Sequence, residues 1–363
     1  MNIHGGDVWQ VAEEMGGDAS ELLDFSANIN PRGLPMQALL RLTRNAGNPQ
    51  LLGFYPDPSA RHLRRALSAH TGVAADQFVI GPGAEALLAP ILRALHVRRV
   101  LVPVPAFSEY RRASEQQNVH YVPFPLHHAD SFQLPVAHLC RRIEEEPFDA
   151  VLLSNPHNPS GAMLDARDVR LVLDAANASG ATLLLDEAFI DSAPGQSLIA
   201  ETIERPGLVV LRSLTKFYGC PALRVGYAAA HPDMARRISS LLPTWPVMQM
   251  ALDALTDALD DRQYVESSLR ENAANRDTLR AALLALGLIV FPSAANYLLV
   301  ELLPRMPSST ELRTRLIKHH RILIRNCDSY EGLTHGHFIR VAVRSAEENE
   351  RLVNALSEEL RAT

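Results

Sequence analysis

Short apolar runs alternate with longer segments of helical periodicity between about residues 78 and 230. The runs that we interpret as strands are FVI (78–80), VLVPV (100–104), HYVPF (120–124), AVLLS (150–154), TLLLDEA (182–188), LVVLR (208–212) and VGYAA (225–229). Helix candidates such as AEALLAPILRAL and ARDVRLVLDAANAS separate several of them. Near-continuous apolar strands joined by helical crossovers indicate a mostly parallel sheet buried on both faces. The pattern therefore predicts an α/β fold with a mostly parallel seven-stranded sheet sandwiched by helices. Ligands of such sheets bind beyond the carboxyl ends of the strands.

The pattern changes after Trp245. A long helix candidate (about 264–286) precedes NYLLVEL, a second helix near 310–320, the apolar runs ILIRN and FIRVAV, and a closing helix. This mixture is typical of a smaller α+β domain. The first thirty-odd residues are rich in Gly, Asn and Pro and are expected to form an arm that packs on another part of the protein. We therefore divide the chain into an arm (1–35), a large domain (36–245) and a small C-terminal domain (246–363).

Composition and charge exclude several classes of protein. The 363 residues are 47% hydrophobic, and the formal net charge is −6 with no long basic run, which disfavours a nucleic-acid partner. No apolar stretch approaches the roughly 20 residues needed to cross a bilayer, and the N-terminus lacks the features of a signal peptide. The three cysteines, Cys140, Cys220 and Cys327, show no metal-ligand spacing. We expect a cytoplasmic protein with reduced cysteines, no membrane contact and no metal.

Lysine is rare in this chain. Of 35 basic residues only Lys216 and Lys318 are lysines, and the rest are arginines. An ammonium group can lose its proton and form a Schiff base with an aldehyde, whereas a guanidinium cannot at ordinary pH. Lys318 lies in LIKHHR, which we interpret as a polar helix end, so Lys216 is the candidate for such chemistry.

Three polar loops follow predicted strands. Gly81-Pro82-Gly83-Ala84-Glu85 opens a helix, where backbone N–H groups attract an anion, although such turns are often only tight connections. The segment 154–161, SNPHNPSG, contains two Asn-Pro pairs that force a rigid turn, and a stiff connector is the simpler interpretation. Asp186 ends an apolar run, so it needs a cationic partner, either a protonated pyridine nitrogen or an arginine.

The segment around Lys216 brings phosphate-binding groups close to it in sequence. Ser213 and Thr215 offer hydroxyl donors, and Arg224 offers a guanidinium. A ligand whose phosphate contacts these residues would place an aldehyde within reach of Lys216. The order and spacing of all four segments indicate a site for such a ligand more strongly than any one segment does.

That order resembles the aspartate-aminotransferase type of pyridoxal-phosphate enzyme (fold type I) over nearly the whole chain. The matching motifs are NPHNPSG, DEAF and SLTKFYGCPALRVGY. The resemblance implies that pyridoxal 5'-phosphate is the cofactor and that Lys216 is its Schiff-base lysine. The other implied cofactor contacts are Asp186 to the pyridine nitrogen, Asn158 to the ring oxygen, Phe107 stacked on the ring, and Ser213, Thr215, Arg224 and the Gly83, Ala84 and Glu85 amides on the phosphate. Tyr55 would reach the phosphate of the neighbouring subunit, which implies a homodimer with shared active sites.

Further segments narrow the resemblance within the family. HGG (4–6), DFSANINPRGLP (24–35), ANYLL, RILIRNC and RVAVRS are similar to the threonine-phosphate decarboxylases of cobalamin synthesis, which are relatives of the histidinol-phosphate aminotransferases. This resemblance implies that Arg340 binds the substrate carboxylate and that His4, Asn28 and Arg325 receive its phosphate, near Asn158. The simpler interpretations are arm packing for His4 and a surface ion pair for Arg325.

Four positions depart from the wider family, and the differences at His157 and Ser160 are tolerable in a turn. Phe189 stands where most members have a tyrosine, and this change is shared by the decarboxylases. The loop at Ala84 lacks the expected side-chain hydroxyl. A decarboxylase of L-threonine O-3-phosphate is the function that the resemblance implies. An aminotransferase acting on histidinol phosphate and a serine-phosphate decarboxylase remain alternatives. A transcription regulator would need an additional DNA-binding domain, and a non-catalytic relative would usually have lost the lysine.

Overall fold

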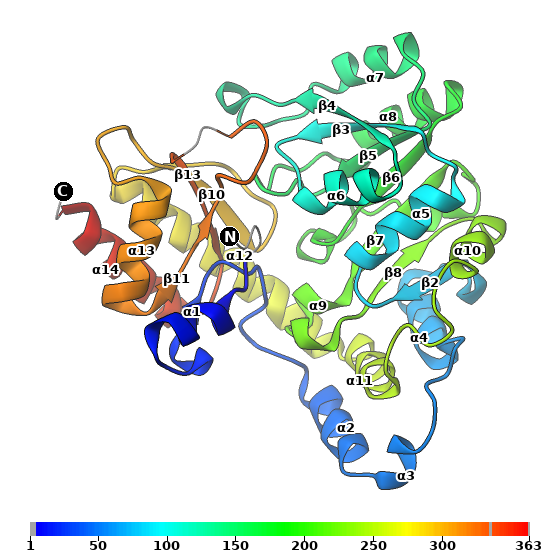
Figure 1. Cartoon of the computed structure of the whole chain (residues 1–363), viewed down its shortest axis with the longest axis horizontal. Helices are drawn as coiled ribbons and strands as arrows, with labels where there is room; N and C mark the ends of the chain where they lie inside the picture. Colours follow the sequence, from blue (N-terminus) through cyan, green and yellow to red (C-terminus); the bar gives the residue numbers. More distant parts are fainter. Residues whose placement is uncertain (1–4, 334–335, 362–363) are drawn as a thin grey trace.

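A seven-stranded sheet forms the centre of the large lobe in the computed structural model, which describes residues 5–333 and 336–361 (Figure 1). Its strands are β2 (Phe78–Gly81), β3 (Arg99–Val104), β4 (His120–Pro125), β5 (Ala150–Ser154), β6 (Thr182–Asp186), β7 (Leu208–Ser213) and β8 (Gly226–Ala229). Their order is β2-β8-β7-β6-β5-β3-β4, and β8 runs antiparallel to both of its neighbours while β3 to β7 are mutually parallel. The predicted seven strands and the mostly parallel sheet are confirmed.

Both faces of this sheet are covered, because alternate residues of each strand point to opposite sides. In β6, Leu183 and Leu185 belong to one buried core and Leu184 to the other. The helices that contribute to the first core include α4 (Arg61–Thr71), α7 (Val136–Glu145), α8 (Ala166–Ala178) and α11 (Gln249–Leu259). The helices of the second core are α5 (Leu88–Ala94), α6 (Ser108–Gln116) and α10 (Pro232–Ser239). Burial on both faces explains why the strands are apolar throughout.

The C-terminal part of the chain forms a smaller lobe around a four-stranded antiparallel sheet of order β12-β13-β10-β9. These strands are β9 (Ile289–Val290), β10 (Tyr297–Glu301), β12 (Arg325–Asn326) and β13 (Phe338–Ala342), and the helices are α12 (Arg262–Ala285), α13 (Ser309–His320) and α14 (Ala346–Arg361). The run ILIRN, predicted as one strand, is divided in two. Its first half, β11 (Ile322–Leu323), pairs with the arm, and its second half, β12, pairs with β13.

The arm packs on this smaller lobe. It contains α1 (Val8–Met15) and β1 (Leu23–Asp24), and β1 pairs in parallel with β11. Val11, Ala12 and Leu22 pack against Leu323 in one small buried cluster. The chain then passes Lys216, since the backbone N–H of Asn30 donates to the Lys216 carbonyl over 3.1 Å. The N-terminal segment is therefore part of the structure on which the pocket depends.

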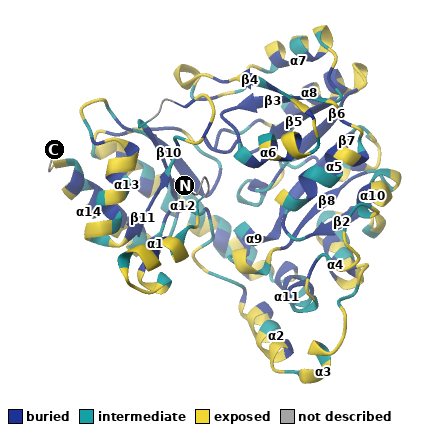
Figure 2. Ribbon diagram, in the orientation of Figure 1, coloured by how far each residue is buried: buried dark blue, intermediate teal, exposed yellow. Residues whose placement is uncertain are grey.

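Three helices lie at the edge of the large lobe. The chain leaves the arm through α2 (Met36–Ala46) and α3 (Pro49–Leu52), and α11 packs against α2 and α4. Much of α2 and α3 is exposed (Figure 2). The boundary between large and small domains at residue 245 stays a prediction. Among the described residues, no helix is both long enough and apolar enough to span a lipid bilayer.

Candidate active site

A cavity of about 370 Å³ lies beyond the carboxyl ends of the parallel strands, between the large sheet, the small domain and the arm. The site residues predicted from the sequence that line it are Asn28, Gly83, Ala84, Glu85, Phe107, Asn158, Asp186, Ser213, Thr215, Lys216, Arg224, Arg325 and Arg340. They come from segments about 300 residues apart, yet they meet in one cavity, where open α/β sheets bind ligands. His4 lies outside the described residues.

Lys216 lies in the short helix α9 (Leu214–Phe217), directly after β7. Its side chain is half-buried in the cavity wall. Burial lowers its pKa from 10.5 to about 8, with the positive charges of Arg340 and Arg224 acting in the same direction and Asp186 opposing them. The charged form of a lysine is disfavoured by both desolvation and like charge. Lys216 is therefore an amine that can lose its proton near neutral pH, as a nucleophile requires.

Asp186 is the last residue of β6, and Tyr110 of α6 holds its carboxylate. The Tyr110 hydroxyl donates to Asp186 Oδ2 over 2.6 Å, and the Ala188 N–H donates to Asp186 Oδ1 over 2.9 Å. Burial raises the pKa of Asp186, while both hydrogen bonds and the Lys216 charge lower it. The carboxylate is thus oriented by two donors on its protein side. Tyr110 was not predicted, because its partner lies 76 residues away in sequence.

Asn158 is held in one orientation in the turn that follows β5. Its Oδ1 accepts from Arg340 Nη1 over 2.7 Å and from the Tyr330 hydroxyl over 3.2 Å. Because both partners donate, the amide oxygen is directed toward them and the Nδ2 group is left for the cavity. This orientation suits an amide that donates to an oxygen atom of a ligand.

The loop after β2 forms a cradle with few side-chain atoms. Gly83 has φ +97°, and a Cβ there would lie 2.7 Å from Arg224 Nη2. A Cβ on Gly226 would lie 2.2 Å from the Ala84 backbone nitrogen. Both positions therefore require glycine. Arg224 itself has φ +52°, a left-handed conformation that is strained for arginine and that is often found at functional sites.

Hydroxyl and guanidinium donors surround this cradle. The Ser213 and Thr215 hydroxyl oxygens are 2.8 Å apart, at the end of β7. The Arg224 side chain is half-exposed, and its Nη2 is 3.9 Å from Glu85 Oε2, which is beyond a close ion pair. Two hydroxyls, a guanidinium and backbone N–H groups form a donor set suited to a phosphate.

Arg340 of β13 lies at the other end of the cavity, and it is 6% exposed. Its guanidinium donates to Asn158 Oδ1, to the Tyr330 hydroxyl over 2.9 Å and to the Ser26 carbonyl over 3.1 Å. None of these acceptors is charged, and no carboxylate lies within 4 Å of Arg340 in residues 5–333 and 336–361. A buried cation with only neutral partners is costly, so an anionic ligand fits this position.

Arg325 and Asn28 lie beside Arg340. Burial and the Arg340 charge lower the pKa of Arg325, and its Nη2 donates to the Ser329 hydroxyl over 2.7 Å. The Asn28 side chain is 2% exposed, and neither its Nδ2 nor its Oδ1 has a hydrogen-bond partner within the described chain. Buried amides are rarely left without partners, so Asn28 is suited to bind a polar ligand group in the cavity.

Tyr330 connects these residues. Its hydroxyl contacts Arg340 and Asn158, and the Arg325 guanidinium lies 5.5 Å from its ring centroid. It is 6% exposed and lines the cavity. Tyr330 was not predicted as a site residue. It contacts both arginines, which are register partners on β12 and β13.

Phe107 and Phe189, the two phenylalanines singled out from the sequence, have different surroundings. Phe107, at the start of α6, lines the cavity and packs edge-on against Tyr110 with centroids 5.7 Å apart. Phe189 also lines the cavity and packs against Tyr297 at 4.9 Å. Because Phe189 has no hydroxyl, it adds only apolar surface to this wall.

Tyr55 lies outside this cavity and lines a separate depression near α3. It is 77% exposed and stacks on Trp245 with ring centroids 4.3 Å apart. Within one chain it therefore makes no contribution to the cavity. Its predicted role requires a second copy of the chain, and that role stays a prediction.

Comparisons with known proteins agree with this architecture. The chain is 36% identical to the threonine-phosphate decarboxylase of Salmonella typhimurium over 98% of this chain and 96% of that protein. It is 33% identical to the histidinol-phosphate aminotransferase of Roseiflexus castenholzii, over 96% and 92% of the two chains. The solved histidinol-phosphate aminotransferase of Sinorhizobium meliloti in complex with pyridoxal-5'-phosphate shares the fold, with a TM-score of 0.87 at 24% identity over 97% of this chain and 94% of that one. Residues 20–356 match the family Aminotransferase class I and II, and the chain belongs to that family.

Proposed function

We propose that the protein catalyses the pyridoxal-phosphate-dependent decarboxylation of L-threonine O-3-phosphate to (R)-1-amino-2-propanol O-2-phosphate and carbon dioxide, a step of cobalamin biosynthesis. The observation that carries this proposal is the pair of cationic anchors, Arg340 and Arg325, which lie on neighbouring strands of the small domain and line the cavity together with Asn28 of the arm. A substrate with both a carboxylate and a phosphate needs two such anchors. The full-length relative in Salmonella typhimurium, which is named for this activity, supports it.

The residues fit pyridoxal 5'-phosphate. Asp186 offers an oriented carboxylate for the ring nitrogen, Asn158 Nδ2 is available to the ring oxygen, and Phe107 offers an aromatic face. The glycine cradle at Gly83, together with Ser213, Thr215, Arg224 and the Ala84 and Glu85 amides, would hold the phosphate. When bound, the cofactor supplies an electron sink for the Cα bond that breaks.

The remaining chemistry falls to the chain's own residues. Lys216 would hold the cofactor covalently and, once released by the substrate amine, carry a proton beside Cα. Its lowered pKa suits both tasks, because an amine with a pKa of about 8 gives up and regains a proton near neutral pH. Asp186 would keep the ring nitrogen protonated.

Arg340, Arg325, Asn28 and, on its prediction, His4 would set the orientation of the substrate. A decarboxylase must orient its substrate so that the bond from Cα to the carboxylate is the one that breaks. With the carboxylate on Arg340 and the phosphate on Arg325 and Asn28, rotation about the bond to Cα is restricted. The two anchors would therefore determine which bond breaks as well as which substrate binds.

The test is an incubation of the cofactor-loaded protein with L-threonine O-3-phosphate without any keto acid. Sustained release of carbon dioxide and aminopropanol phosphate in equal amounts is the expected result. Conversion of the cofactor to its amine form after one turnover, without carbon dioxide, would contradict the proposal and would favour the histidinol-phosphate type of aminotransferase. L-Serine O-phosphate should be compared in the same assay, because an apolar pocket distinguishes one methyl group by only about 1–3 kcal/mol.

The proposal includes a cytoplasmic homodimer with shared active sites. Exposed apolar residues gather around α2, α3 and the start of α11, namely Met36, Leu39, Leu40, Leu52, Phe54, Tyr55, Trp245 and Met248. Such a patch is typical of a protein–protein interface. A second copy that covers it would bring Tyr55 to the cofactor phosphate of its partner. A molar mass of one chain in light scattering, or unchanged cofactor affinity in Tyr55→Phe, would contradict the shared site.

A further inference from the structure

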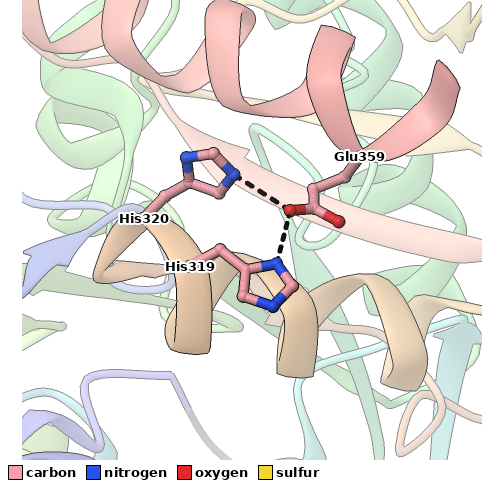
Figure 3. Close-up of side chains that lie close together, drawn as sticks. All are labelled: His319, His320 and Glu359. Atoms are coloured by element: carbon pink, nitrogen blue, oxygen red, sulfur yellow. Dashed lines mark hydrogen bonds and ion pairs between the residues drawn. The ribbon is translucent and has the colours of Figure 1, made fainter. Parts of the chain in front are cut away.

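Three potential metal ligands converge at the C-terminal end of the small domain. His319 and His320 are the last two residues of α13, and Glu359 lies in the last turns of α14 (Figure 3). His319 Nδ1 is 2.8 Å and His320 Nε2 is 3.0 Å from the same oxygen, Glu359 Oε1. Across the described parts of the chain, this is the one group of three His, Cys, Asp or Glu residues whose ligand atoms lie within 4.8 Å of one another.

The distances from Glu359 Oε1 to the two histidine nitrogens are close to those between ligand atoms around a bound metal ion. Ligand atoms at about 2.0–2.1 Å from a tetrahedral zinc ion lie roughly 3.3 Å apart. Each histidine nitrogen is therefore within about 0.5 Å of that separation from Glu359 Oε1, and the two nitrogens, which lie within 4.8 Å of each other, would approach each other as the rings turn toward the ion. The Glu359 side chain is 8% exposed and the His319 side chain 49% exposed, so the carboxylate is held by the protein while an ion can enter from solvent.

We propose that His319, His320 and Glu359 bind a divalent transition-metal ion of the zinc class, which bridges α13 and α14. Two imidazoles and one carboxylate suit Zn²⁺, Co²⁺ or Ni²⁺ better than Mg²⁺ or Ca²⁺, which prefer oxygen ligands. Water or the exposed Glu358, whose Oε2 is 3.9 Å from His320 Nε2, would complete the coordination. Each neutral imidazole would carry its proton on the nitrogen that faces away from the ion, so no net proton is released from it.

The competing interpretation is a hydrogen-bonded contact between two helices. Hydrogen bonds from His319 and His320 lower the pKa of Glu359, and they would add to the apolar packing of α14 against α13 without any ion. Glu359→Gln separates the two interpretations. A glutamine oxygen still accepts both N–H bonds, but a neutral amide is a much poorer ligand for a zinc-class ion than a carboxylate.

The experiment is equilibrium dialysis of the cofactor-loaded enzyme against Zn²⁺ after chelator treatment, paired with thermal unfolding. We expect one ion to bind per chain at this group. At saturating Zn²⁺ the unfolding temperature should rise by about 3 °C, and a chelator should reverse this rise. His320→Ala and Glu359→Gln should each weaken this binding at least roughly tenfold.

His128→Ala is the matched control, because His127 and His128 are also adjacent and exposed but do not belong to a three-ligand group. It should bind Zn²⁺ as the unmodified protein does. Absence of a Zn²⁺-dependent rise in unfolding temperature, or binding in His320→Ala with the affinity and stoichiometry of the unmodified protein, would overturn the proposal.

Discussion

The proposed cofactor end of the cavity is built from residues that directly follow strands of the large sheet, whereas the proposed substrate end combines the arm with the small domain. Asp186 and Ser213 are the last residues of β6 and β7, and Asn158 lies just after β5. At the other end, Arg340 and Arg325 belong to neighbouring antiparallel strands. The two ends therefore depend on different parts of the chain.

This difference separates cofactor chemistry from substrate choice. The parallel sheet is buried on both faces, so a packed core holds the ends of its strands in place. The substrate end is held by contacts such as that between Arg340 Nη2 and the Ser26 carbonyl, which are 314 residues apart in sequence. Changes there can alter the substrate or the bond that breaks with less effect on the cofactor site, which the substrate end contacts through the hydrogen bond from Arg340 to Asn158. Four predictions test this division.

Lys216→Ala has the largest expected effect. Without the amine, turnover should fall by at least roughly a thousandfold, because both covalent attachment and proton transfer are lost. Substrate affinity, measured by calorimetry on the cofactor-loaded variant, should change little, because the anchors at the other end are intact. Comparable activity in this variant would refute the assignment of Lys216.

Arg340→Ala should affect mainly the substrate end. Loss of a buried charge contact to the substrate carboxylate should lower kcat/KM roughly a hundredfold or more. Cofactor loading, followed by absorbance, should remain, and Arg340→Lys should recover part of the activity by restoring the charge without the bidentate fork. Loss of cofactor binding in Arg340→Ala would contradict the separation of the two ends.

Tyr330→Phe should have a smaller effect. The ring stays against Arg325, but the hydroxyl that joins Arg340 to Asn158 is lost, so kcat/KM should fall roughly tenfold. The fraction of turnovers that end in the amine form of the cofactor should rise, because the carboxylate is held less firmly. Tyr121→Phe, in β4 and outside the cavity lining, is the control. An equal loss in both variants would show that the Tyr330 hydroxyl has no positioning role.

The smallest expected effect is on the pH dependence of cofactor capture by Lys216, through which the Arg340 charge at the substrate end acts on the cofactor end. Because its pKa is about 8 rather than 10.5, the rate at which the cofactor-free protein captures the cofactor aldehyde should rise with pH and level off above about 8. Arg340 contributes to that lowering, so Arg340→Ala should move the plateau to higher pH. A plateau that does not move would show that the Arg340 charge does not reach Lys216.

Most of the large sheet could be predicted from sequence, because strands buried on both faces produce continuous apolar runs. Lys216, Asp186 and Asn158 stood out because each ends or follows such a run, while their cofactor roles rest on the family resemblance and stay predictions. Tyr110 and Tyr330 could not be predicted, because their importance lies in hydrogen bonds to Asp186 and Asn158, which are 76 and 172 residues away. The division of ILIRN also escaped prediction, because the arm that pairs with its first half is distant in sequence.

The most direct test is a crystal structure of Lys216→Ala with pyridoxal 5'-phosphate and L-threonine O-3-phosphate, in which the absence of the lysine amine should slow turnover enough to trap the substrate. This division of the cavity predicts the substrate carboxylate on Arg340 and its phosphate on Arg325 and Asn28, with the cofactor phosphate at Gly83, Ser213 and Arg224. A substrate phosphate on Arg340, or a substrate that contacts neither arginine, would contradict it.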